Sequence, residues 1–95
     1  MATKKKITKS ILTVGSKVFI RTVTHYYTGI LTAIDKDWLH IDKAAWIADA
    51  SRWSTALDKG VLNEVEPYPD GEVLVARGAI VDVCAWPHDL PRAVK

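Results

Sequence analysis

Alternating apolar and polar residues mark the first half of the chain as extended. In residues 17–23, Val18, Ile20 and Thr22 fall on one side of a strand, because successive side chains of a strand point to opposite faces. β-branched and aromatic residues, which favour strands, are frequent here and in the two stretches that follow. The strands predicted in this half cover residues 17–23, 26–35 and 38–41.

Two further strands are predicted near the end of the chain, over residues 72–77 and 79–86, with Gly78 between them. Residues 61–66 alternate weakly and are interpreted as either a strand or an extended segment. The sequence Pro-Tyr-Pro-Asp-Gly at residues 67–71 breaks regular structure, since Pro and Gly both interrupt strands and helices.

The pattern changes after the strand predicted over residues 38–41. Four apolar residues recur there at intervals of four, three and four positions, which is helical spacing and gives one apolar stripe. They are Trp46, Ala50, Trp53 and Leu57. Gly60 follows and suits a helix C-cap. The stripe therefore predicts one helix over residues 45–59, and its tryptophans are expected to pack in a core or an interface.

The predicted fold is mainly β: a small, strongly bent five-stranded barrel with one inserted α-helix. Gly29 and Gly78 interrupt strand-like stretches, where glycine usually marks a bulge or a sharp bend. A small bent barrel leaves edge strands available for pairing with another chain. The predicted divisions are a basic N-terminal tail at residues 1–14, the barrel at residues 15–86 with its helical insertion at about 45–60, and an irregular C-terminal tail at residues 87–95.

Charge is unevenly distributed, although the net charge is only +2. Residues 1–17 carry five lysines and no acid, whereas the rest of the chain carries eight basic and eleven acidic residues. A protein that wraps duplex DNA is usually basic across a whole face, which this body is not. The first lysines are interpreted as a solvated terminal segment; they are Lys4, Lys5, Lys6 and Lys9. An acidic run is interpreted as a solvated loop, or as a contact for the lysine tail of a neighbouring copy; it consists of Glu64, Glu66, Asp70 and Glu72.

The residue types needed for catalysis or metal binding do not cluster in the sequence. Cys84 is the single cysteine, so neither an intrachain disulfide nor a thiolate metal site is expected. The three histidines, His25, His40 and His88, lack the short spacing of a metal site. No phosphate loop, nucleophile elbow or catalytic carboxylate pair is present, so no enzymatic activity and no cofactor are expected. Without a secretory signal or a membrane-length apolar run, a soluble cytoplasmic protein is expected.

Two stretches combine glycine and charged residues in a distinctive order. The first has Gly15 before an alternating strand, Gly29 in mid-strand, Asp35 after an apolar residue, and Ala44 near the end of a third strand. The second has the apolar residues 73–76, then Arg77 and Gly78, then Ile80. In this order and hydrophobic phase, they resemble the paired signature of the Sm-like (LSm/Hfq) superfamily. The region between them, residues 45–72, contains the predicted helix and has no counterpart in the family.

The resemblance implies an Sm-like or SH3-like barrel within a ring of identical subunits, in which the fourth strand of one copy pairs with the fifth strand of the next. Sm-like proteins often bind single-stranded RNA around the central pore. The resemblance assigns Asp35 and Arg77 to such a pocket, with Trp38 as a stacking face. The family's asparagine is not matched, because Leu39 or His40 stands near its place, and the lysine–histidine pair typical of Hfq is absent.

Two functions are consistent with these features. The first is a non-enzymatic, ring-forming protein that binds single-stranded nucleic acid, RNA in particular, through Asp35, Trp38 and Arg77, with nonspecific attraction from the four lysines of residues 4–9. The alternative is a structural scaffold subunit that forms a homomeric ring, stack or phage-like lattice without nucleic acid. Arg77 would then pair with an acid of a neighbouring copy, such as Asp35 or Asp82.

Overall fold

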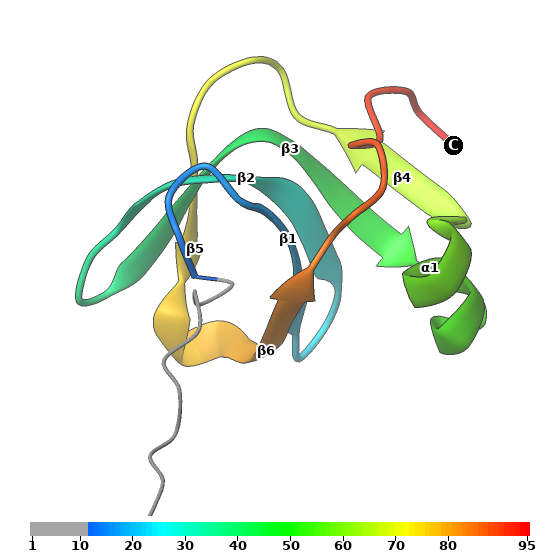
Figure 1. The fold of residues 1–95 in the computed structure, drawn as a ribbon, viewed down its shortest axis with the longest axis horizontal. Coiled ribbons are helices and arrows are strands. Elements are labelled where there is room, and N and C mark those ends of the chain that lie inside the picture. The colour runs from blue at the N-terminus through cyan, green and yellow to red at the C-terminus, as the bar shows by residue number, and fades with distance from the viewer. Residues whose placement is uncertain (1–11) are drawn as a thin grey trace, which may run out of the picture.

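Six antiparallel strands and one α-helix make up residues 12–95, the part of the chain that the computed structural model describes (Figure 1). Their bounds are β1 Lys17–Thr22, β2 Tyr26–Ile34, β3 Trp38–Asp49, α1 Trp53–Lys59, β4 Glu64–Pro67, β5 Val73–Ala76 and β6 Ile80–Ala85, with a 3₁₀ turn at Arg77–Ala79 between the last two strands. The predicted mainly β class with a single helix is confirmed. The lysines at positions 4, 5, 6 and 9 lie outside the described residues.

The strands form one sheet in the order β4-β3-β2-β1-β6, and β5 also pairs with β3. β5 pairs with the first part of β3, from Trp38 to Ile41, whereas β4 pairs with its last part, from Ala45 to Asp49. Within residues 12–95, β5 pairs only with β3, and β6 only with β1. The sheet is therefore an open path, in which each of these two strands has one edge without a strand partner.

β3 bends between the part that pairs with β5 and the part that pairs with β4. Lys43 lies at this point with a φ of 50°, in the left-handed region that non-glycine residues seldom adopt. The register of β2 against β3 shifts between Thr28 and Ile30, on either side of Gly29. A Cβ atom added to Gly29 would lie 3.0 Å from Ile41 Cβ and 3.1 Å from the carbonyl oxygen of Asp42. Glycine therefore permits β2 to cross the bend of β3 at close range, as the interior glycine predicted.

The bend divides the interior into two apolar cores. The core beside β5 consists of the buried residues Val18, Ile20, Leu31, Leu39, Ile41, Ala44 and Val75. The core beside α1 consists of Phe19, Ala45, Ile47, Ala50, Ala56, Leu62, Val65 and Trp86. Neighbouring residues of β1 alternate between the two cores, as the period of two requires, whereas β3 contributes Leu39, Ile41 and Ala44 to the first core and Ala45 and Ile47 to the second.

The segment after β6 forms neither helix nor strand, but it is held against the core beside α1. The Trp86 indole Nε1 donates to the carbonyl oxygen of Asp89 at 3.1 Å. His88 Nε2 donates to the carbonyl oxygen of Leu57 at 2.8 Å, which attaches the segment to the helix. Further along, the backbone of Lys95 exchanges hydrogen bonds of 2.9 and 3.1 Å with Val65 of β4. The outer edge of β4 is therefore covered at this point by the chain itself.

The predicted helix over residues 45–59 is wrong in its first half. The helix spans only Trp53–Lys59, and residues 45–49 belong to β3, where they pair with both β2 and β4. Pairing on both sides outweighs the weak helical preference of this stretch. The predicted cap is confirmed: Gly60 has a φ of 70°, and its N–H donates to Ala56 O at 2.9 Å.

The predicted number of strands is also corrected. The third strand, predicted over residues 38–41, continues to Asp49, and the segment interpreted as strand or extended becomes β4. This gives six strands in place of five, because residues 64–67 find a partner in the extended end of β3. No helix in residues 12–95 has the length and apolar character needed to cross a membrane.

The close crossing at Gly29 leads to a stability prediction. Replacing Gly29 with Val should lower the free energy of unfolding by about 1–3 kcal/mol, because the new side chain meets both Ile41 and the backbone of Asp42. Gly78→Ala is the matched control, since a Cβ there meets nothing within 4 Å, and it should change stability by less than about 0.5 kcal/mol. Urea denaturation at one fixed protein concentration measures both, and equal effects would contradict the steric explanation.

Candidate functional site

The three residues predicted to share a pocket lie together at the turn between β2 and β3. The Arg77 guanidinium donates from Nη1 to the carbonyl oxygen of Asp35 at 2.7 Å. The backbone N–H of Arg77 donates to the carbonyl oxygen of Asp37 at 2.9 Å. Trp38 begins β3 directly after this turn, opposite Ala76 of β5. Residues 42 positions apart in sequence are thus joined as the two motifs predicted.

The carboxylate of Asp35 is fully engaged within the turn. Oδ1 accepts hydrogen bonds from the backbone N–H groups of Asp37, at 2.9 Å, and Trp38, at 2.8 Å. This arrangement is the usual role of a turn aspartate. Oδ2 lies 2.8 Å from His40 Nε2. The hydrogen bond with His40 and those from the two backbone N–H groups lower the pKa of Asp35. A ligand would have to compete with these contacts for the carboxylate.

His40 joins this turn to the start of β5 and was not predicted as part of the site. Its Nε2 faces Asp35, and its Nδ1 lies 3.1 Å from Glu72 Oε2. The hydrogen bond with Asp35 and then the contact with Glu72 raise the pKa of the imidazole, whose side chain is one-fifth exposed. The short spacing from Asp35 to His40 across a hairpin was the one available signal for this contact. No three His, Cys, Asp or Glu residues within 12–95 are arranged to hold a metal ion.

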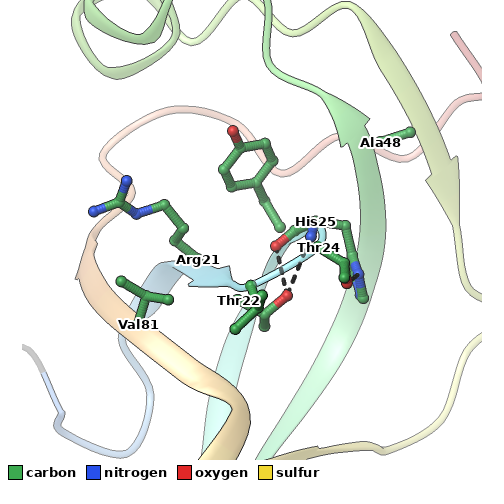
Figure 2. Close-up of a pocket in the computed structure, with 8 residues that line it drawn as sticks. Arg21, Thr22, Thr24, His25, Ala48 and Val81 are labelled. Carbon is green, nitrogen blue, oxygen red and sulfur yellow. Dashed lines mark hydrogen bonds between the residues drawn. The ribbon is translucent and has the colours of Figure 1, made fainter.

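Large apolar side chains are exposed where the β1–β2 turn, the start of β3 and β5 border one cavity. We call the set Val23, Trp38, Leu74 and Val81 the end patch; their exposed fractions are 82, 41, 46 and 54%. The first three line one cavity of about 410 Å³, together with residues of β5 and the 3₁₀ turn. Val23 and Val81 line a second cavity of about 380 Å³ (Figure 2). Val23 borders both cavities, so the end patch is continuous and extends from β5 to β6.

The second cavity is framed by polar contacts that hold its walls in place. Thr22 Oγ1 donates to the carbonyl oxygen of His25 at 2.7 Å and accepts from the His25 N–H at 3.2 Å, so the β1–β2 turn is closed on itself (Figure 2). Arg21 forms a hydrogen-bonded ion pair with Asp82 across β1 and β6, and its guanidinium lies 5.3 Å from the centre of the Trp53 ring. Asp82 therefore has an arginine partner within its own chain.

Asp35 is thus engaged within the chain, Arg77 is exposed and donates one side-chain hydrogen bond to the turn, and Trp38 is 41% exposed. Arg77 bonds to a carbonyl group of Asp35 and not to a carboxylate. Trp38 is the predicted site residue whose side chain offers a free surface, and it does so as part of the end patch. The arrangement suits contact with an apolar surface better than recognition of a charged small molecule.

A scan against protein-family models, a search of curated proteins and a search of solved structures each returned no match to this chain.

The pKa values of His40 and His25 should be shifted in opposite directions. The carboxylates around His40 raise its pKa above the ordinary 6.5, whereas burial lowers the pKa of His25 below it. The contribution of His40 to folding stability is therefore complete below pH 6.5 and is lost as the pH rises through its raised pKa. NMR titration of the imidazole signals measures both values.

Asp35→Asn separates the charge effect from the structure of the turn. The amide oxygen can still accept the two backbone hydrogen bonds, so the turn is preserved while the negative charge is removed. The pKa of His40 should fall toward 6.5, and the pKa of His25 should not move. An unchanged His40 pKa would show that Asp35 does not determine it.

Proposed function

We propose that the chain is a non-enzymatic structural subunit that assembles with copies of itself, by pairing β5 of one copy with β6 of the next. The observation that carries the proposal is that both strands have an open edge and an exposed aliphatic side chain, Leu74 on β5 and Val81 on β6. An open edge with apolar side chains is a ready template for pairing with another chain. Copies joined in this way would form the closed barrel ring that the Sm-like resemblance implies, or an open stack.

The helix lies away from the edge of β5. Figure 1 shows α1 and β5 on opposite sides of the molecule. The helix packs instead into the core formed by Phe19, Ile47 and Trp86. Leu74 and Val81 belong to the end patch and lie on the two strands with an open edge, so pairing of β5 with β6 would remove part of their apolar surface from water. Leu74 and Val81 are already about half buried, so completing their burial contributes about half of the roughly 1.5–3 kcal/mol of a fully exposed side chain.

Assembly should be visible as a mass that exceeds the 10.5 kDa of one chain. Leu74→Lys places a charge beside the open edge of β5 and should convert the assembly to monomers, because a charge on an edge strand opposes pairing. Size-exclusion chromatography with light scattering measures the mass across a range of micromolar concentrations.

Val61→Lys is the matched control for this change. Val61 is exposed to a similar extent, 48%, but it lies between α1 and β4, away from both open edges. It should leave the mass unchanged. A wild-type protein that is monomeric throughout the concentration range, or two variants with equal effects, would contradict assembly through β5.

A second candidate function is binding of single-stranded nucleic acid by the assembled ring. The observation that favours it is the exposed ring of Trp38, which pairs with Ala76, the residue directly before Arg77, since aromatic stacking and arginine contacts are the usual means of holding unpaired bases. The surrounding carboxylates oppose it, because Asp35, Asp37 and Glu72 repel phosphate groups. Assembly and nucleic-acid binding are separable, and each has its own measurement.

Fluorescence anisotropy with labelled oligo-U and oligo-A at two salt concentrations tests this second function. If the pocket binds bases, Trp38→Ala should weaken binding by about 1–3 kcal/mol at both salt concentrations. If attraction comes from residues 4–9, replacing their four lysines with Ala should weaken binding and reduce the slope of log affinity against log salt. The reduction should be about 0.7 for each phosphate group that a lysine had neutralised. Absence of binding at low salt would exclude this function.

A further inference from the structure

A separate cavity lies beside the last part of β3, where β3 pairs with β4. Its volume is about 350 Å³, and its lining consists of Trp46, Glu66, Pro67, Tyr68 and Pro69. Two aromatic rings, two prolines and one carboxylate therefore surround a single space. None of these residues belongs to the site predicted from the sequence, and Trp46 was expected on a helix.

Strand register brings the lining residues together. Trp46 pairs with Tyr27 of β2 on one side and with Glu66 of β4 on the other. Residues directly opposite in neighbouring strands project from the same face of a sheet. The Glu66 carboxylate and the Trp46 ring are therefore neighbours on one face, and the chain continues from Glu66 directly to the remaining lining residues.

The aromatic walls are held by their own packing. Ring centres lie 5.3 Å apart for Trp46 and His25, 4.8 Å for His25 and Tyr27, and 6.3 Å for Tyr27 and Tyr68. His25 and Tyr27 thus connect the rings of Trp46 and Tyr68, which line the cavity. Such contacts restrict the ring positions before any ligand binds, which lowers the entropic cost of binding.

The backbone of Tyr68 is fixed as well. Its N–H donates to the carbonyl oxygen of Ala44 at 2.9 Å. Arg92 then spans the same two residues, donating from Nη1 to Ala44 O at 2.9 Å and from Nη2 to Tyr68 O at 3.0 Å. Its Nη2 also lies 3.5 Å from Asp70 Oδ1. The guanidinium of Arg92 therefore bonds to Ala44, Tyr68 and Asp70, and it makes no ion pair with Glu66.

The carboxylate of Glu66 has no side-chain hydrogen bond or ion pair with any residue in 12–95. It is exposed and lies within an acidic stretch that also contains Glu64 and Asp70. An unpaired carboxylate beside two aromatic faces is complementary to a cation, because the faces carry negative quadrupole charge. The same charges oppose an anionic ligand such as a nucleotide.

We propose that this cavity binds the cationic side chain of a lysine or arginine, presented by an extended segment of a partner protein. The cation would lie against Trp46 and Tyr68 and pair with Glu66. The partner is recognised through this side chain and not through strand addition at β4, because the backbone of Lys95 already pairs with Val65. The site lies on the part of β3 that pairs with β4, and its lining residues are not among those of the end patch.

A short fluorescein-labelled peptide of repeated Gly-Pro-Lys, with a Gly-Pro-Gln counterpart, provides the test on the full chain. The lysine peptide should bind and the glutamine peptide should not. Glu66→Gln and Tyr68→Leu should each weaken binding by about tenfold, because each removes one side of a partly desolvated cation site. Glu64→Gln removes the same charge two positions along β4, outside the cavity lining, and should change binding by less than about twofold.

Circular dichroism melting curves establish that each variant folds, and Glu66→Gln changes only an exposed side chain. Equal weakening by Glu66→Gln and Glu64→Gln would overturn the proposal, because binding would then reflect long-range charge alone. Binding of the glutamine peptide with the same affinity, or no binding of the lysine peptide at low salt, would also overturn it. Competition by oligo-U for the same cavity would contradict the cationic specificity.

Discussion

The bend of β3 is the constraint on which the rest of the structure depends. One strand provides the partner for β5 before the bend and for β4 after it, and it contributes residues to one core along its first part and to the other core along its last part. The bend requires the unusual backbone of Lys43 and the absence of a side chain at Gly29. A straight β3 would present one flat sheet, which a chain of this size could not close around an apolar interior. The bend thus separates the pairing of β5 from the pairing of β4 along one strand.

Much of the fold could be predicted, because side-chain alternation records which residues face the interior. The strand beginning at Trp38 and the cap at Gly60 followed from local pattern alone. The start of the helix could not, because Trp46 and Ala50 match helical spacing by coincidence, while Ala45 and Ile47 are buried with a period of two. Only the partner strands decide between these patterns, and partners are set by tertiary contacts.

The sequence indicated Asp35, Trp38 and Arg77 as candidate residues, but it did not predict the contacts that they make in the structure. Asp35 and Arg77 meet as the two motifs suggested, yet the aspartate closes a turn and the arginine holds its backbone. His40 and Glu72 lie far apart along the chain, and the sequence has no signal that pairs them. The aromatic cavity was missed for the same reason, since its lining residues on β3 and β4 become neighbours only through strand register. Roles depend on hydrogen-bond partners, which pattern alone does not determine.

The contact between Lys95 and Val65 has a consequence for the geometry of any assembly. It covers the outer edge of β4 at Val65, so within residues 12–95 the sheet edges of β5 and β6 are the ones that no backbone segment pairs with. These two edges differ in sequence, which makes a contact between them heterologous, with a distinct donor and acceptor side. Every added subunit would then have the same orientation along the assembly, so that the two faces of the assembly would differ. The rotation between successive copies decides whether the assembly closes into a ring or continues as a filament. In both forms, the contact between Lys95 and Val65 would oppose branching at the edge of β4.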